Sequence, residues 1–358
     1  MSAGALPAWG AGPRDLRAAV ARFQAPILAK SIGQVATSLG CFAAVCAGMY
    51  LAIDVSVWIA LALTPLAAAF LVRIFIIQHD CGHGAFFRSR AANSVLGALC
   101  SVLTLTPYLN WRRQHAGHHG VWNNLDRRQT GADIYSTCLT VSEYRALSPW
   151  RRRWHRMTRH PVVSNLLLPP LVFFVLYRWP FDAPKSWRRE RWGVHLTNVA
   201  IAGVVVGLGL LIGFGRIAVV QLPVMMTASI IGVWLFSVQH RFEHTLWLRQ
   251  GRWDASAAAL RGSSYLRLPA LLRWFTGNIG LHHIHHLNPR VPNYRLQECQ
   301  DAIPALAEVP SLSLGAGLRA PRFTLWDEDR ARMVTFREVA ARRDPNAGSV
   351  VARSAAAR

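Results

Sequence analysis

The sequence predicts an all-α integral membrane protein, in which four transmembrane helices form two hairpins and a cytoplasmic helical cap holds a histidine-rich site for two metals. Three observations favour this fold. Hydrophobic residues make up 52% of the 358 residues and charged residues only 16%, against roughly 25% in soluble domains. Four uncharged runs are each long enough to cross a bilayer, which takes about 20 residues of helix. Histidines gather in short clusters near the ends of these runs.

The four uncharged runs come as two pairs with very short turns, one at Asp54 and one ending at Arg216. Because neither turn can hold a domain, each pair is expected to form a transmembrane hairpin. The predicted spans are residues 31–53, 55–77, 193–214 and 217–238. Residues 1–30 are expected to form a cytoplasmic N-terminal segment, residues 31–330 the membrane domain, and residues 331–358 a cytoplasmic C-terminal tail.

Two further apolar runs are ambiguous. Residues 91–111 are uncharged but broken by Pro107, and residues 160–177 contain Pro161, Pro169 and Pro170. Proline interrupts the hydrogen bonding of a helix. Each run is therefore compatible with a span, a re-entrant segment or a helix in the membrane interface.

The charge distribution predicts an orientation. The net charge is +22, which would fit a nucleic-acid-binding protein. However, only Arg73 and Arg216 of the 40 Lys and Arg residues fall within a predicted span or outer turn. The positive-inside rule then places both termini and residues 78–191 in the cytoplasm. We interpret the positive charge as the feature that orients the protein in the membrane and contacts lipid headgroups. We expect no nucleic-acid partner. Arginine outnumbers lysine 38 to 2, which favours a bacterial source and hence the inner membrane.

Eleven of the fourteen histidines fall in four clusters whose members are three or four residues apart. Residues at this spacing share one face of a helix, so each cluster can direct two or three imidazoles at one point. A single ion takes about three protein ligands at a catalytic zinc site, so the number of imidazoles predicts two metals. The clusters are His79 and His83; His115, His118 and His119; His240 and His244; and His282, His283, His285 and His286.

Several other metal proteins are excluded by what the sequence lacks. It contains neither the HExxH motif of zinc proteases nor the Glu-x-x-His pairs of carboxylate-bridged di-iron bundles. Its six cysteines include no CxxC pair, which argues against a zinc knuckle. A metal transporter or sensor remains an alternative, but it would need ligands inside the spans, whereas these histidines lie at or beyond the span ends.

The sequence resembles the membrane-bound fatty acid desaturases, and in particular their acyl-lipid, omega-6 or delta-12-like branch. The three histidine boxes of that family, HxxxH, HxxHH and a late HxxHH, match three of the four clusters. The flanking segments HDCGHGAFF, TLTPYLNWRRQHAGHH and GNIGLHHIHHLNPRVPNY match as well. The resemblance covers about residues 30–330. The late box begins with His282 and not with the Gln of front-end desaturases.

The resemblance implies an enzyme with two Fe2+ ions that uses O2 and two electrons to insert a cis double bond into an acyl lipid or acyl thioester. A narrow apolar channel would hold the acyl chain. The electrons would come from a separate ferredoxin or cytochrome b5-like donor, because the heme-binding HPGG segment is absent. A lipid, alkane or carotenoid hydroxylase or ketolase is the alternative. The implied metal ligands are His79, His83, His115, His118, His119, His240, His244, His282, His285 and His286. Members of the family vary at the position of His244.

Other polar residues near the boxes are expected to orient the ligands, since a ligating histidine usually donates its second N–H to a carboxylate. For Asp126 an ion pair with Arg127, Arg128 or Arg241 is the alternative. The expected orienting residues are Asp80, Asp126, Asp133, Glu243 and His283.

A single metal site requires that all boxes lie on one side of the membrane. Residues 91–111 are then predicted not to cross it as a single span, and residues 160–177 are left out of the spans.

Overall fold

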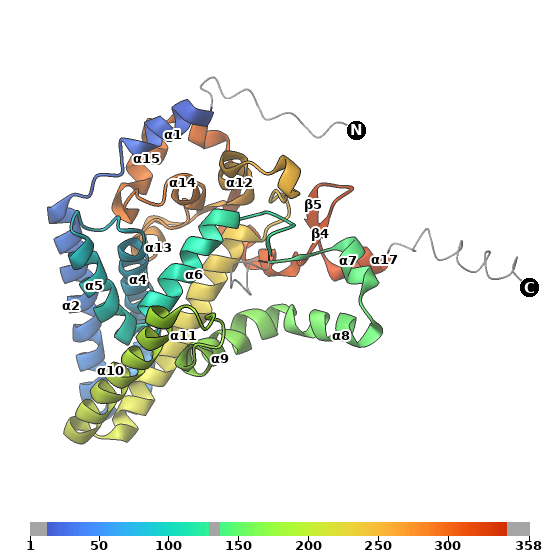
Figure 1. Ribbon diagram of the computed structural model, residues 1–358. Coiled ribbons are helices and arrows are strands. Elements are labelled where there is room, and N and C mark those ends of the chain that lie inside the picture. The colour runs from blue at the N-terminus through green and yellow to red at the C-terminus, as the bar shows by residue number, and fades with distance from the viewer. Residues whose placement is uncertain (1–12, 129–136, 342–358) are drawn as a thin grey trace, which may run out of the picture.

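The computed structural model describes residues 13–128 and 137–341, and most of them are helical (Figure 1). Its helices are α1 Pro13–Ala21, α2 Leu28–Ile53, α3 Val57–Ala62, α4 Thr64–His83, α5 Arg90–Leu103, α6 Tyr108–Val121, α7 Val141–Ala146, α8 Pro149–Thr158, α9 Leu168–Phe174, α10 Arg188–Ile212, α11 Phe214–His240, α12 Ala255–Gly262, α13 Ala270–Phe275, α14 His282–Leu287, α15 Leu296–Ala302, α16 Leu314–Arg319 and α17 Phe336–Ala341. Its short strands are β1 Leu139–Thr140, β2 Tyr265–Arg267, β3 Ser311–Ser313, β4 Leu325–Asp327 and β5 Arg332–Val334.

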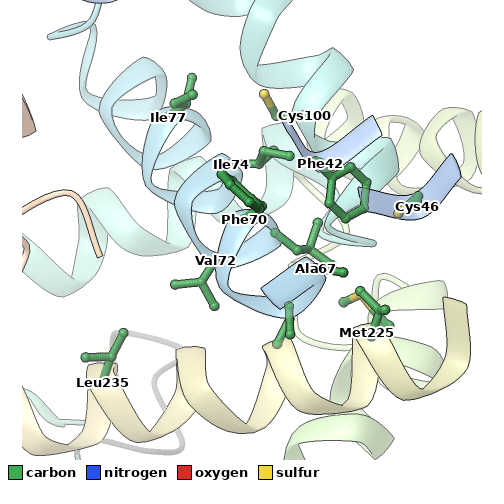
Figure 2. Close-up of a cluster of buried hydrophobic side chains, with 14 of the residues drawn as sticks. Phe42, Cys46, Ala67, Phe70, Val72, Ile74, Ile77, Cys100, Met225 and Leu235 are labelled. Atoms are coloured by element: carbon green, nitrogen blue, oxygen red, sulfur yellow. The ribbon is translucent and has the colours of Figure 1, made fainter. Parts of the chain in front are cut away.

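Four helices of the described chain are long and apolar enough to cross a membrane, namely α2, α4, α10 and α11. This confirms the all-α membrane fold. The helices form two hairpins, and an ion pair between Asp54 and Arg216 joins the two outer turns. α4 packs against α2, α5 and α11. Its side chains Phe70 and Ile74 lie in the apolar core with Phe42 of α2 and Met225 of α11 (Figure 2). α4 is thus the central helix of the bundle.

The second span differs from the predicted residues 55–77. It is broken into α3 and α4 at Leu63, and α4 has Pro65 in its first turn. A proline is tolerated at this position because the N–H it lacks would have no partner within the helix. α4 then continues to His83 and ends where Gly84 adopts a left-handed conformation with φ 67°, so the first histidine box lies on the last turns of this helix.

The apolar run at residues 91–111 forms two helices, α5 and α6, which meet at an angle of 106°. Leu105 lies between them with a positive φ of 53°, and Pro107 caps α6. The two helices approach closely, since a Cβ on Gly97 would lie 2.4 Å from the Tyr108 ring. The run therefore folds back on itself and brings the second histidine box to the end of α4.

Residues 160–177 form an irregular helical segment. A π-helical turn, Val163–Leu167, precedes α9, and a 3-10 turn, Leu176–Arg178, follows it. Pro169 and Pro170 have no N–H to donate, so regular α-helical bonds are lost in this segment. The segment meets α8 at an angle of 54°, and α8 extends away from the four-helix bundle (Figure 1).

The cap includes more of both ends of the chain than the predicted boundaries assign to it. Leu16 and Val20 of α1 are buried against Ile284 of α14, so part of residues 1–30 belongs to the cap. β5 pairs with β4 in a small sheet of order β1-β4-β5, and Val339 of α17 is buried beside it. The predicted tail therefore contributes folded structure up to residue 341, and residues 342–358 lie outside the described part.

The fold generates a prediction about sidedness. Ser31 of α2 donates a hydrogen bond of 2.7 Å to the Phe86 carbonyl, which places the start of α5 at the histidine end of the bundle. Single cysteines in place of Ser89 and Ser148 should therefore react with an impermeant thiol reagent from one membrane side, and one in place of Gly215 from the other.

The parent protein for this labelling should carry Cys41→Ser, because Cys41 is the exposed one of the six native cysteines. Labelling is measured in right-side-out and inverted vesicles. Opposite sidedness of the Ser89 and Ser148 sites would contradict the fold.

Candidate metal centre

The histidine clusters come together from four helices. His79 and His83 lie on the last turn of α4, and the second box lies on α6. His240 is the last residue of α11, and the late box forms α14. α4 and α11 run toward the cap, so their C-terminal ends deliver histidines to the same place (Figure 1). The convergence follows from the two hairpins and from the bend between α5 and α6.

The first group contains His79, His83, His115 and His285, and one ring nitrogen of each lies within 4.8 Å of the others. The Nε2 atoms of His79 and His115 are 3.1 Å apart. His119 joins this group, because its Nε2 lies 3.2 Å from that of His115 and 3.0 Å from that of His285.

The second group contains His118, His240 and His286, whose ligand atoms also lie within 4.8 Å of one another. The Nε2 atoms of His118 and His240 are 3.2 Å apart. His282 joins this group through its Nε2, which lies 2.9 Å from that of His240. Nine of the ten predicted ligand histidines are thus gathered into two neighbouring groups.

These distances fit metal coordination. Two nitrogens each about 2.1 Å from one ion and at right angles to each other are about 3 Å apart. In addition, the Nε2 atoms of His83 and His286 are buried and have no hydrogen-bond partner. Buried polar atoms are normally paired, so these two nitrogens are free to bind an ion. The site can therefore hold a metal in each group.

The protonation state of the late box also suits metal binding. Burial and the neighbouring histidines lower the pKa of His282, His285 and His286 well below the usual range of histidine. These imidazoles are therefore neutral at physiological pH. A neutral imidazole has a free lone pair, which is the form that binds metals.

Comparison with known proteins gives the family. A sequence model of the fatty acid desaturases matches residues 56–313. A fatty acid desaturase of Bacillus subtilis (strain 168) is 42% identical over 326 residues, which cover 91% of each chain. The chain belongs to the fatty acid desaturase family. It is therefore an oxidoreductase that acts on acyl lipids, and the family resemblance expected from the histidine boxes is confirmed.

More distant relatives of this desaturase carry more specific names. An sn-1 oleoyl-lipid 12-desaturase of Picosynechococcus sp. (strain ATCC 27264 / PCC 7002 / PR-6) is 26% identical over 279 residues, covering 75% of this chain and 74% of the relative. An sn-1 acyl-lipid omega-3 desaturase (ferredoxin) of Synechocystis sp. (strain ATCC 27184 / PCC 6803 / Kazusa) is 27% identical over 250 residues, covering 66% and 65%.

An apolar cavity of about 290 Å³ adjoins the histidines of the desaturase. α4 contributes Leu71 and Phe75, the irregular segment contributes Val172 and Phe173, and α11 contributes Phe236. The histidines in its wall are His79, His115, His118 and His282. The cavity therefore borders both histidine groups with a largely apolar wall.

The structure places Asp80 where a ligand-orienting carboxylate was expected. Its Oδ1 lies 3.3 Å from Nδ1 of His79. Its Oδ2 accepts hydrogen bonds of 2.7 and 2.8 Å from the backbone and side-chain nitrogens of Asn293. Asn293 also exchanges hydrogen bonds with Gln34. Asp80 thus links the first box to the segment after the late box.

Asn293 was not identified from the sequence as part of the site. The available signal was its place in the segment NPRVPNY directly after the late box. The ring centroid of Trp122 lies 3.7 Å from that of His240 and 4.6 Å from that of His118. Trp111 stacks on His115 with centroids 4.7 Å apart. These rings fix the orientation of the imidazoles.

Asp126 differs from the expectation that it orients a ligand. Its Oδ1 accepts a hydrogen bond of 2.7 Å from Arg249, and its Oδ2 accepts one of 2.8 Å from the backbone N–H of Gln250. These two donors lower the pKa of Asp126, so its carboxyl group stays charged. The ion-pair alternative fits this geometry, with Arg249 as the partner.

The other expected residues are also placed away from the two groups. Glu243 pairs with Arg332 at 2.9 Å. His283 is buried, and its Nε2 lies 2.9 Å from the Gln300 side-chain oxygen. His244 is exposed and belongs to neither group of the described residues. Asp133 lies outside the described residues.

The contrast between Asp80 and Asp126 generates a prediction. Asp80→Asn removes the carboxylate beside His79, so we expect metal affinity to fall about 10- to 100-fold, as is typical when a residue that orients a metal ligand is replaced. The measurement is the metal retained during titration with a chelator.

Asp126→Asn is the matched control, because it makes the same substitution at an exposed ion pair. Exposed ion pairs contribute little to stability, so metal affinity should be unchanged. Equal metal loss in the two variants would contradict the assigned role of Asp80.

Proposed function

We propose that the chain is a di-iron desaturase that inserts a cis double bond into the acyl chain of a membrane lipid. The observation that carries this proposal is the convergence of nine imidazoles, in two groups, beside an apolar cavity that four of them line. Two bound irons would supply the redox chemistry by which O2 becomes two waters, with two electrons from a donor, two protons from solvent and the two hydrogens that leave the acyl chain. Imidazole is a suitable ligand for iron.

In this proposal the two groups hold one iron each. The first iron would be bound by His79, His83, His115, His119 and His285, and the second by His118, His240, His282 and His286. His244, which was among the expected ligands, is left out because it is exposed. Asp80 orients His79, and Trp122 holds His240 and His118 in place.

In this proposal the apolar cavity is the binding site of the acyl chain. Its apolar wall binds the acyl chain and excludes water from the histidines, and the fixed position of the chain selects which carbons face them. Positioning of this kind accounts for a large part of enzymatic rate enhancement. The electrons would come from a ferredoxin or a cytochrome b5-like protein, and relatives named as ferredoxin-dependent support the former.

For the position of the double bond we propose omega-6, delta-12-like specificity. The start of the late box at His282 and the flanking segments support it, as do relatives named as 12- and omega-6 desaturases. The second candidate is a hydroxylase or ketolase, which would use the same ligands. We further propose that the protein resides in a bacterial inner membrane with both termini in the cytoplasm, because the Arg-rich segments lie at the histidine end.

The first prediction from this proposal concerns metal content. The purified protein should contain about two irons per chain, one for each histidine group. His83→Ala removes a buried ligand of the first group and His286→Ala one of the second, so each should lower the iron content to roughly one and abolish turnover. Iron is measured by plasma emission spectrometry.

His244→Ala is the matched control for metal content, since this histidine is exposed, and it should retain both irons. Stoichiometric zinc in place of iron, with no O2 consumption under reducing conditions, would contradict the di-iron proposal.

The second prediction concerns the product. A host that supplies oleate-type chains and expresses the protein should accumulate a diene with the new bond on the methyl side of the existing one. The bend at a cis bond would hold the chain in register with the irons. Gas chromatography with mass spectrometry of the lipids reads out the product.

The product should disappear in His118→Ala and His285→Ala and persist in His244→Ala. A hydroxylated chain would favour the second candidate function. A double bond placed in a saturated chain, with no diene, would contradict only the proposed specificity.

A further inference from the structure

A second hollow, of about 270 Å³, lies at the start of α10 and is lined by basic side chains. Arg188, Lys185 and His195 are exposed in it, and Arg191 is half-buried. Trp192 completes the lining. Within the described residues the lining contains no carboxylate. The hollow is therefore suited to an anion and not to a cation.

Nearby acidic groups are engaged elsewhere. Glu190, which follows Arg188 and Arg189 in the sequence, pairs with Arg113 of α6 at 2.9 Å. Asp182 accepts a hydrogen bond of 3.2 Å from the Asn110 side chain. Within the part of the chain that the structure describes, neither Lys185 nor Arg188 forms an ion pair. Their charges remain available to a ligand.

The basic hollow and the apolar cavity share one loop. Phe181 and Asp182 line the apolar cavity. Arg191, in the wall of the basic hollow, donates hydrogen bonds of 3.0 and 2.8 Å to the carbonyls of Pro180 and Ala183, which flank those two residues. A single side chain thus joins the lining of one space to the lining of the other. Phe181 is 60% exposed, so the cavity reaches the surface at this loop.

The basic hollow lies at the start of α10, at the level where lipid headgroups are expected. Trp179 and Trp192 are each 65% exposed, and exposed tryptophans are enriched where a membrane meets water. The lipid-facing part of α10 continues from there through Leu196 and Val199, which are also exposed. Lys and Arg at this level interact with the phosphates of lipids.

We propose that the basic hollow binds the phosphate of the acyl carrier whose chain enters the cavity at Phe181, and so selects phosphate-bearing substrates. This inference rests on the proposed desaturase function. A phosphate held by Lys185 and Arg188 anchors the headgroup at a fixed place. The distance from that anchor to the histidines then sets how far along the acyl chain the reacting carbons lie.

The test compares substrates that carry the same acyl chain on different headgroups. The purified holoenzyme is assayed with phosphatidylglycerol, with uncharged galactosyl diacylglycerol and with acyl-CoA. In Arg188→Ala and Lys185→Ala, we expect KM for phosphatidylglycerol to rise roughly three- to ten-fold, since each loses a charge-assisted contact. KM for the galactolipid, which carries no phosphate, should stay unchanged.

Arg189→Ala is the matched control, because Arg189 is an exposed neighbour that does not line the hollow. It removes the same charge and should leave all KM values unchanged. A KM increase for acyl-CoA alone would support the phosphate site and assign it to a thioester carrier. An equal increase for the galactolipid, or in Arg189→Ala, would overturn the inference, because it would show a general effect of surface charge.

A second measurement separates this inference from the proposed function. Native mass spectrometry counts the phosphatidylglycerol molecules retained by the purified chain, whether or not the chain turns over. Arg188→Ala should retain fewer than Arg189→Ala. If the protein desaturates none of the three substrates, the proposed function fails while the retention assay still tests the hollow. Equal retention by both variants would overturn the phosphate site.

Discussion

The structure depends on one constraint, which is that nine imidazole nitrogens must face one another in a buried space. Two of these atoms, Nε2 of His83 and Nε2 of His286, have no hydrogen-bond partner, and a buried polar atom without a partner is costly. Two metal ions would satisfy them, and the rigid elements around them resist their separation. The central helix α4 is packed on several sides, and α11 ends at His240. Trp111 stacks on His115, and Trp122 packs at a tilt against His240. The apolar core in the spans thus serves to align the ends of two helices.

The four spans and the histidine groups could be predicted because each produces a local signal in the sequence. A span is a long uncharged run, and ligands that share a helix face are three or four residues apart. His79 with His83 and His115 with His119 needed only helical periodicity, and the requirement that the boxes meet excluded a single crossing at residues 91–111. The angle of 106° between α5 and α6 shows that these residues do not form one straight helix.

Long-range polar pairing was not predictable, because nothing in local sequence fixes which charge meets which. Asp126 and Glu243 lie near boxes in the sequence, yet their partners are Arg249 and Arg332, which are far away along the chain. The packing of β5 and α17 into the cap has the same origin. It is set by neighbours in space, and the polar composition of the C-terminal segment gave no sign of it.

The segment that was hardest to interpret from the sequence lines the apolar cavity of the protein. The proline-rich run at residues 160–177 has no continuous α-helix, and its π-helical and 3-10 turns leave Val172, Phe173 and Tyr177 facing the cavity. A regular span in this position would be stabilised by its own hydrogen bonds, but it would present a straight face to α11. The irregular segment instead curves around the cavity and delivers Phe181 to its surface opening. Departures from regular secondary structure are commonly found at functional sites, and here the departure shapes the space beside the histidines.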